Sequence, residues 1–246
     1  PGILHGRNSR HPVRRMLRVG DRQALQIISL KAGQATRDIE RRVLGRPQHQ
    51  ATHRVAEDIR FLGQARLDEL LGVLPEDLVI KDPDLLAGYQ RDEADLCAYG
   101  RPVAVVRPRE TAQVAAVVQL AGRHRVPVVA QGARTGLAGA ANALDGSIVV
   151  SFTGMDRILE IDPVNRIAVV QPGVVNADLN RAAAAHGLRY PPDPGSWESS
   201  TVGGNAATNA GGMCCVKYGV TAEYVLGLEV VLPSGEIVTL GGKRVK

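Results

Sequence analysis

Short polar side chains and paired glycines gather in one stretch of the sequence, Ser200–Gly219. The glycine pairs allow a backbone to approach a ligand closely, and the hydroxyl and amide side chains can donate and accept hydrogen bonds. The stretch carries little charge, so it is suited to binding a ligand through main-chain and neutral groups. The alternative interpretation is an irregular connecting loop. The residues that could contact a ligand are Thr201, Gly203, Gly204, Asn205, Thr208, Asn209, Gly211 and Gly212.

A second glycine-rich stretch, QGARTGLAGAA at 131–141, directly follows a short apolar run that predicts a buried strand. Such a loop presents several backbone N–H groups in one concavity, which is a site for a pyrophosphate. Its glycines, at Gly132, Gly136 and Gly139, match neither the G-x-G-x-x-G turn nor a Walker loop. Arg134 either pairs with a phosphate or faces solvent. Two such loops in one chain predict a large phosphorylated cofactor lying between them.

The sequence offers no clear catalytic base and no metal ligand set. His124 and His186 each close a predicted helix, where an imidazole can oppose the negative end of the helix dipole. The acidic residues Asp92, Glu93 and Asp95 lack the ligand spacing of a calcium loop. We interpret them as part of a solvated loop. We therefore leave the catalytic residues unassigned and predict no metal site.

The net charge of +5 over 246 residues is distributed unevenly. Residues 1–60 carry thirteen Lys or Arg against five Asp or Glu, and they contain no aromatic side chain. Such a segment buries little apolar surface, so we expect a disordered basic extension, with some helix over Gln23–Ile28 and Thr36–Leu44. A nucleic-acid-binding arm is the functional alternative, but the aromatic residues that would stack on bases are absent from it.

The three cysteines and the hydropathy pattern limit the compartment. An odd cysteine count argues against a secreted disulfide framework, and no apolar run reaches the roughly 18 residues of a membrane helix. We therefore expect a cytoplasmic protein without a transmembrane segment, which could be peripheral to the inner face of the membrane.

From residue 61 onward the pattern of apolar residues predicts a globular domain of mixed α and β structure. Pro102–Pro108, Ala112–His124 and Val126–Ala130 form a predicted βαβ unit, with Thr111 as the helix N-cap. Antiparallel hairpins are expected further along, so the domain is not a purely parallel α/β fold. The other predicted elements are strands at Ser147–Phe152, Ile158–Ile161, Ile167–Val170, Val225–Leu232 and Ile237–Leu240, and a helix that begins at Asn176 or Ala177 and ends at His186.

Three ordered segments carry a family resemblance. They are PVVAQGARTGLAGAAN, VVQPGVVNADLNRAAAAHGLRYPPDPGS and STVGGNAATNAGGMCCVKYGVTAEYVLGLEVVLPSGEIV. In this order they resemble the PCMH-type FAD-binding domain of the vanillyl-alcohol oxidase superfamily, and within it the group of glycolate oxidase flavin subunits and D-lactate dehydrogenases. The resemblance implies an α+β fold in which two α/β subdomains hold FAD. It also implies that residues 61–246 are an FAD-binding domain truncated at its C-terminal end, following the extension at 1–60.

The resemblance further implies which residues contact FAD. The loop at 131–136 would hold the pyrophosphate, the segment at 192–196 would pass the phosphates and the flavin, and the Gly-Gly-Asn stretch would lie beside flavin and ribitol. Related enzymes with covalent flavin often carry a histidine in the first loop, and its absence here implies non-covalent FAD. The implied cofactor-binding residues are Gln131, Gly132, Ala133, Arg134, Thr135, Gly136, Gly139, Asn142, Pro192, Asp193, Pro194, Gly195, Ser196, Thr201, Gly203, Gly204, Asn205, Thr208, Asn209 and Ile237.

The activity implied by the resemblance is oxidation of a D-2-hydroxy acid, such as glycolate or D-lactate, to the 2-oxo acid. The catalytic base would lie in a substrate cap domain downstream, so this fragment is expected to be inactive alone, and an electron acceptor or iron–sulfur protein would be its partner. The alternatives are another flavoenzyme of the superfamily acting on an alditol, a lactone or an ether lipid, or an inactive truncated product. A nucleic-acid binder is the least favoured alternative.

Overall fold

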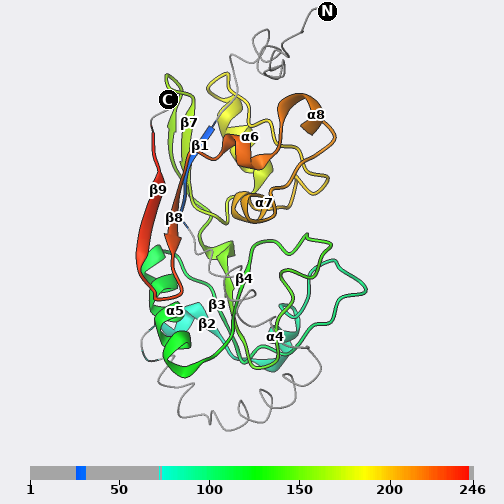
Figure 1. Ribbon diagram of the computed structural model, residues 1–246, viewed down its shortest axis with the longest axis vertical. Helices are drawn as coiled ribbons and strands as arrows, with labels where there is room; N and C mark the ends of the chain where they lie inside the picture. Colours follow the sequence, from blue (N-terminus) through cyan, green and yellow to red (C-terminus); the bar gives the residue numbers. More distant parts are fainter. Residues whose placement is uncertain (1–25, 32–71, 73, 244–246) are drawn as a thin grey trace, which may run out of the picture.

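The computed structural model describes residues 26–31, 72 and 74–243 of the chain. These residues form two lobes stacked along the long axis of the molecule, and each lobe is built on its own β-sheet (Figure 1). Helices and both parallel and antiparallel strand pairs occur in the two lobes. The structure therefore has the mixed fold of two α/β subdomains that the sequence predicts.

The smaller lobe contains a four-stranded sheet in the order β2-β3-β5-β4. β3 and β4 each pair in parallel with β5, which lies between them, while β2 is an antiparallel edge strand. The helix α5 connects β3 to β4, so the expected βαβ unit is present. The elements are η2 (Glu76–Leu78), β2 (Val79–Ile80), α4 (Pro83–Ala87), β3 (Ala104–Val106), α5 (Thr111–His124), β4 (Val128–Gln131), β5 (Ile148–Ser151) and η3 (Phe152–Gly154).

The helix α5 covers one face of this sheet with an apolar stripe. Val114, Val117 and Leu120 are buried at helical spacing and belong to one core cluster with Ile148 of β5. The N-cap of α5 is Glu110, so the expected cap at Thr111 is wrong by one residue. The Thr111 hydroxyl instead donates a hydrogen bond of 2.6 Å to Glu229 in the other lobe. This tertiary contact is invisible to a local capping rule.

The larger lobe contains a five-stranded sheet in the order β6-β7-β1-β8-β9. The two predicted hairpins, β6–β7 and β8–β9, are confirmed as antiparallel pairs. In the first hairpin the Asp162 carboxylate accepts hydrogen bonds from the N–H groups of Val164 and Asn165, both at 3.0 Å, which closes the turn. The strands are β1 (Gln26–Lys31), β6 (Ile158–Asp162), β7 (Ile167–Val170), β8 (Gly227–Val231) and β9 (Ile237–Gly241).

The strand β1 lies inside the segment for which the sequence predicts a disordered extension. It pairs in parallel with both β7 and β8, so Gln26–Lys31 joins the two hairpins into one sheet. The expected helix over Gln23–Ile28 is wrong in its described part, because pairing with two strand edges overrides a weak local helical preference. The expected helix over Thr36–Leu44 lies outside the described residues.

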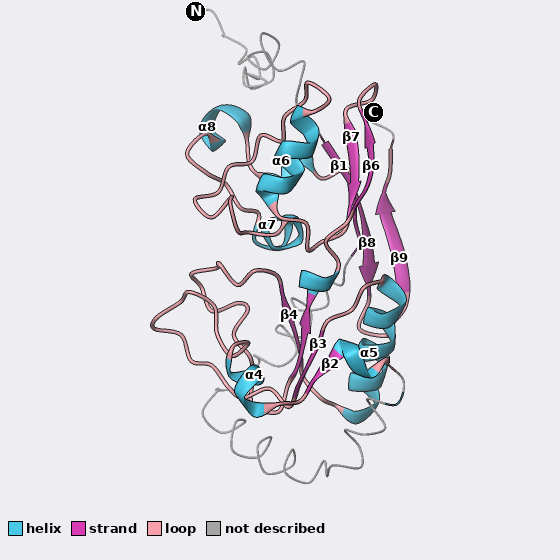
Figure 2. Ribbon diagram, turned by 180° about the vertical axis from the view of Figure 1, so that it is seen from behind, coloured by secondary structure: helices cyan, strands magenta, loops and turns pink. Residues whose placement is uncertain are grey.

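Helices cover one face of the larger sheet, as Figure 2 shows from behind. Leu179 and Ala183 of α6 pack with Val202 of α7 and with Ala168 and Val170 of β7 in a second core cluster. Gly187 follows α6 in the left-handed region, with φ at 68°, a conformation that glycine adopts readily after a helix. The helical elements here are α6 (Asn176–Ala184), α7 (Val202–Thr208), α8 (Cys215–Tyr218) and η4 (Thr221–Tyr224).

The β8–β9 hairpin links the two lobes, because it runs from the larger sheet down beside α5 (Figures 1 and 2). Val231 at the end of β8 belongs to the core cluster of the smaller lobe. The amide of Gln119 on α5 donates to the carbonyl of Gly235 in the hairpin turn. Among the residues described here, no helix is long and apolar enough to cross a membrane.

Candidate functional site

The first glycine-rich loop begins where β4 ends. β3, β4 and β5 run parallel, so the loop leaves the sheet at the carboxyl edge, where parallel sheets bind ligands. The N–H groups of residues 133–140 donate no hydrogen bond to any other described residue. Backbone donors of ordered loops are normally satisfied by protein, water or ligand. Water or a ligand can therefore accept hydrogen bonds from this loop, and its role in binding a cofactor stays a prediction.

The two glycine-rich stretches meet at Gly132 and Thr201. A Cβ atom on Gly132 would overlap the Thr201 hydroxyl and would lie 3.8 Å from the Cα atom of Gly204. Only glycine allows the loop after β4 to approach α7 this closely. The structure thus brings together the two stretches that the sequence identifies, one from each lobe.

A short segment before α6 holds the start of α7 from the other side. The N–H of Gly203 donates to the carbonyl of Pro172 and the N–H of Val202 donates to that of Val174, both at 2.8 Å. The hydroxyl of Thr201 accepts from the N–H of Gly204 at 3.2 Å. Because the first N–H groups of α7 already have partners, this seven-residue helix is not an anion site. Among the described residues, a row of unpartnered backbone donors lies instead in the loop after β4.

The segment between Tyr89 and Ala98 braces that loop. The buried amide of Gln131 donates to the carbonyls of Tyr89 and Ala141, at 2.8 and 2.7 Å. The side-chain oxygen of Asn142 accepts from the N–H of Asp92 at 2.8 Å, and its side-chain nitrogen donates to the backbone carbonyl of Ala98. Gln131 and Asn142 therefore fix the two ends of the loop, and their contacts with a cofactor stay a prediction.

Asp92 is a structural residue of this brace. The residue is only 6% exposed, and its carboxylate accepts hydrogen bonds from the N–H groups of Ala94 and Ala141. The interpretation of Asp92 as part of a solvated loop is therefore wrong, whereas Glu93 and Asp95 are exposed as expected. Sequence spacing gave no signal for this role, because Ala141, one of the two partners of the carboxylate, lies 49 positions away.

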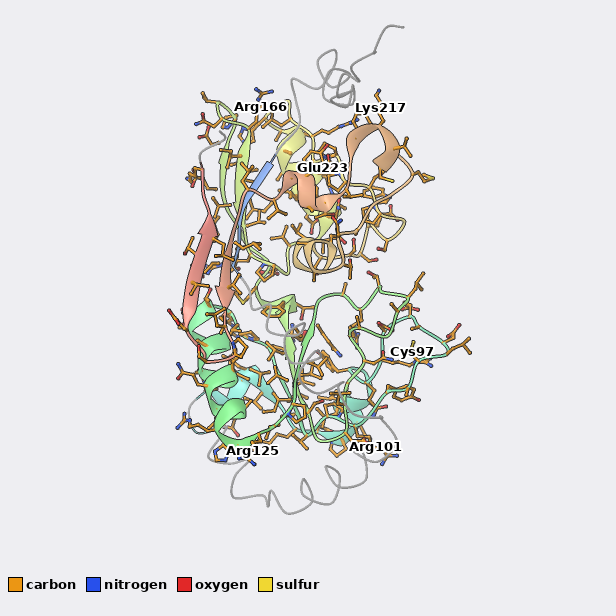
Figure 3. All side chains as sticks on the ribbon, in the orientation of Figure 1. Cys97, Arg101, Arg125, Arg166, Lys217 and Glu223 are labelled. Atoms are coloured by element: carbon orange, nitrogen blue, oxygen red, sulfur yellow. The ribbon has the colours of Figure 1, made fainter. Side chains whose placement is uncertain are left out.

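The centre of the loop contains Arg134 in the left-handed region, with φ at 60°. Its guanidinium carbon lies 5.0 Å from the centre of the Tyr89 ring. Ala133 and Thr135 flank it and are half-buried. Further along, Gly139 has φ at 72° and packs against the side chain of Cys97. Figure 3 shows Cys97 on the side of the molecule that faces away from β9.

The segment at 192–196 lies beside α8. The side chain of Asn176 donates to the carbonyl of Pro192 at 3.1 Å, and the N–H of Cys214 donates to the Asp193 carboxylate at 3.3 Å. The carbonyls of Pro194 and Ser196 accept hydrogen bonds from the residues that follow them. The N–H groups of Asp193, Gly195 and Ser196 have no partner among the described residues. This segment therefore offers further donors to a ligand.

The end of α7 is closed by the predicted amide and hydroxyl residues. The Thr208 hydroxyl donates to the carbonyl of Gly204, and Asn209, with φ at 51°, accepts from the N–H of Ala222. Asn205 is buried, and its side-chain nitrogen has no partner among the described residues. The same holds for Ser200 Oγ and Gln131 Oε1. These atoms are polar groups that a bound ligand or water would satisfy, so the site fits a polar cofactor.

Ile237 lies apart from these segments. It is the first residue of the edge strand β9, and β9 runs along the side of the molecule opposite the loops after β4 (Figures 1 and 2). Its side chain is 44% exposed. The structure does not bring Ile237 near the other predicted contacts, and its assignment stays a prediction.

Two cations gather on one aromatic ring beside the site. The guanidinium of Arg189 lies 4.2 Å and the ammonium of Lys217 lies 4.8 Å from the centre of the Tyr218 ring. Hydrogen bonds from Lys217 and Arg189 hold the pKa of Tyr218 below its usual value. The neighbouring Cys214 has a raised pKa, because its thiol is hydrogen-bonded to the Asp193 side chain. Figure 3 shows Lys217 on α8, at the outer end of the larger lobe.

The part of the chain that the structure describes contains no cluster of three or more His, Cys, Asp or Glu side chains able to hold a metal. His124 lies in the last turn of α5, as expected, and His186 lies just beyond α6. The arrangement can bind a phosphorylated ligand, and no proton-transfer residue is assigned to it.

Comparison with known proteins places these segments in a family. A family described as FAD binding domain matches residues 102–241, which is more than half of the chain. The glycolate oxidase subunit GlcD of Bacillus subtilis is 48% identical over 145 residues, covering 59% of this chain and 31% of that protein. The D-lactate dehydrogenase of Anaerostipes hadrus is 43% identical over 175 residues, covering 71% and 36%. The chain thus spans about a third of the length of these relatives.

The solved structures that resemble this fold include p-cresol methylhydroxylase with substrate bound. Its TM-score is 0.63 at 23% identity, and the match covers 73% of this chain and 36% of that one. At this identity the likeness shows the fold alone, and it confirms the expected PCMH-type fold.

Proposed function

This chain belongs to the FAD-binding domain family, and we propose that it is the cofactor-binding part of an oxidoreductase that oxidises a D-2-hydroxy acid to the 2-oxo acid. The names of the relatives support this substrate class, because they include a glycolate oxidase subunit, a D-lactate dehydrogenase and a D-2-hydroxyglutarate dehydrogenase. Glycolate and D-lactate are the substrates we propose first. The electron acceptor or iron–sulfur partner, and a cytoplasmic location, are further parts of the proposal.

One observation carries the cofactor assignment. The N–H groups of residues 133–140 have no partner within the described chain, and this loop lies against the second glycine-rich segment at Thr201. A row of free amides is suited to a pyrophosphate, because it binds negative charge without a strong requirement for cationic side chains. The free N–H groups of Asp193, Gly195 and Ser196 extend the same kind of surface in the other lobe.

The proposed roles follow the two lobes. In the smaller lobe the loop at 131–136 holds the pyrophosphate, and Gly139 and Asn142 position the chain where it leaves the loop. In the larger lobe the segment at 192–196 and the start of α7 hold the flavin and ribitol, where the unsatisfied amide of Asn205 can bond to a polar edge. We propose that attachment is non-covalent, since no histidine lies in the first loop. When bound, FAD supplies the two-electron chemistry that the amino-acid side chains lack.

The assignment is tested by incubating the purified chain with FAD, desalting it and recording the visible absorbance spectrum. We expect retained flavin absorption, and release of the flavin into the supernatant after acid precipitation. Riboflavin, which lacks the phosphates, is the matched ligand control. Its affinity should be at least about tenfold lower, which corresponds to one charge-assisted hydrogen bond. A chain that is folded by circular dichroism and yet retains no FAD would refute the cofactor site.

The substrate class requires a separate test with a protein that spans the full length of the relatives. Reduction of bound flavin under anaerobic conditions by D-lactate or glycolate, but not by L-lactate, is the expected result. Reduction by an alditol or a lactone and by none of these hydroxy acids would overturn the substrate class while leaving the cofactor site intact.

A further inference from the structure

We propose that Tyr89 is a positioning residue for Arg134, and that this pair supplies positive charge to the phosphates bound by the loop after β4. The inference rests on the proposed function, because it concerns the same cofactor site. It adds a residue from outside the two glycine-rich stretches, and it assigns to Arg134 the phosphate-binding alternative rather than the solvent-facing one.

Arg134 is placed among the free N–H donors of the loop. It is half-buried, and it forms no ion pair with any carboxylate of the described chain. Its backbone has φ at 60°, a conformation that costs a side-chain-bearing residue free energy relative to glycine. A cation held in this conformation, with no carboxylate partner among the described residues, is available to an anionic ligand at the loop.

Tyr89 is anchored independently of Arg134. Its N–H donates to the carbonyl of Leu86 at 3.0 Å, and its carbonyl accepts from the Gln131 amide at 2.8 Å. Its ring packs against the core cluster that contains Leu86, Val129 and Val149. The ring therefore forms a fixed surface next to the loop, and Arg134 lies 5.0 Å from its centre.

The contact with Tyr89 holds Arg134 without using up its hydrogen-bond donors. Attraction to the face of an aromatic ring is electrostatic and does not consume the N–H groups of the guanidinium. These donors can bind two phosphate oxygens at once, which an ammonium group cannot do with the same geometry. Tyr89 thus restricts the arginine side chain in advance and reduces the entropy lost when the phosphate binds.

The buried carboxylate of Asp92 explains why the loop benefits from a cation. A Cβ atom on Gly136 would lie 3.5 Å from an Asp92 carboxylate oxygen, so this acidic group is next to the same loop. Its negative charge opposes the binding of a pyrophosphate in a partly dehydrated site. Arg134 offsets this repulsion, while the backbone amides supply the directional bonds.

The test is an equilibrium titration of the apo chain with FAD at low and at high NaCl concentration. Binding is measured by flavin fluorescence. The variants are Arg134→Asn, Tyr89→Phe, Tyr89→Leu and the double variant Tyr89→Leu/Arg134→Asn. Asparagine removes the charge but tolerates the left-handed backbone, and phenylalanine retains the aromatic face. Thermal unfolding of each apo variant separates weaker binding from loss of fold.

We expect Arg134→Asn to weaken FAD binding about 10- to 100-fold, the range of a lost charge-assisted hydrogen bond. Tyr89→Leu should weaken it about 3- to 10-fold and Tyr89→Phe less than about twofold. In the double variant Tyr89→Leu should add nothing to Arg134→Asn, because the ring acts only through the arginine. NaCl should weaken FAD binding by the unmodified chain more than by Arg134→Asn.

The outcomes separate the two proposals. Tight FAD binding by the unmodified chain together with equal affinity of Arg134→Asn would overturn the role of the pair alone. Additive losses in the double variant would overturn the positioning role of Tyr89. Failure of the folded, unmodified chain to bind FAD would overturn the cofactor site itself, and the role of the pair with it.

Discussion

The main chain of Gly132 packs directly against the hydroxyl of Thr201, and this contact joins the two glycine-rich segments of the molecule. Gly132 follows a strand of the smaller lobe, whereas Thr201 caps a helix of the larger lobe. The relative position of the two lobes at the candidate site therefore depends on the absence of a side chain at residue 132.

Substitution of Gly132 should disturb this junction. In Gly132→Ala the new methyl group would overlap the Thr201 hydroxyl. We expect a loss of about 1–3 kcal/mol in the free energy of unfolding, the usual cost of overpacking, together with weaker FAD retention. Urea unfolding measures the first effect. Gly242→Ala is the control, because no atom lies within 4 Å of the Cβ that this substitution adds. Equal free energies of unfolding for the two variants would contradict the prediction.

Asp92 should be more important for stability than its acidic neighbours. Asp92→Ala would remove the side-chain partner of the buried Ala94 N–H and of the half-buried Ala141 N–H. We expect a destabilisation of about 1–3 kcal/mol by thermal or urea unfolding. Asp95→Ala is the matched control, since Asp95 is exposed and its substitution should change stability by less than about 0.5 kcal/mol. A larger effect at Asp95 than at Asp92 would show that the brace is wrongly assigned.

The two threonines at the ends of α7 should respond differently to truncation. Thr201 caps the helix through a hydrogen bond to the N–H of Gly204, whereas the exposed hydroxyl of Thr208 bonds to a carbonyl within the helix. Thr201→Ala should cost about 0.5–2 kcal/mol, the range of a lost N-cap. Thr208→Ala should cost less than about 0.5 kcal/mol. Similar losses in both variants, measured by urea unfolding, would argue against the capping role.

Tyr218 should ionise at a lower pH than an ordinary tyrosine. Lys217 and Arg189 lower its pKa by stabilising the phenolate. Because the pKa of the phenol is lower in the folded than in the unfolded chain, its ionisation adds to stability only as the pH rises through the lowered pKa. Absorbance of the tyrosinate during a pH titration should show an early transition. Tyr218→Phe should remove that transition and Arg189→Gln should move it to higher pH; a titration unchanged by both would refute the assignment.

Much of the fold follows from local patterns in the sequence. Alternating and helical spacing of apolar residues predicts the βαβ unit and both hairpins, because these elements depend on neighbours a few residues away. The two glycine-rich stretches are also recognisable from the sequence, because their glycines and short polar side chains are visible in the composition alone. The family resemblance agrees with both.

The contacts of Asp92, Tyr89 and β1 were decided only by the tertiary structure. The sequence predicts that Asp92 is a solvated acid, whereas in the structure it bonds to Ala141 and Asn142. The sequence gives no sign that the guanidinium of Arg134 lies over the ring of Tyr89. Gln26–Lys31 becomes a strand because two hairpins offer it free edges. These contacts join residues far apart in the chain, and their stability comes from packing and pairing that form only when the whole domain is assembled.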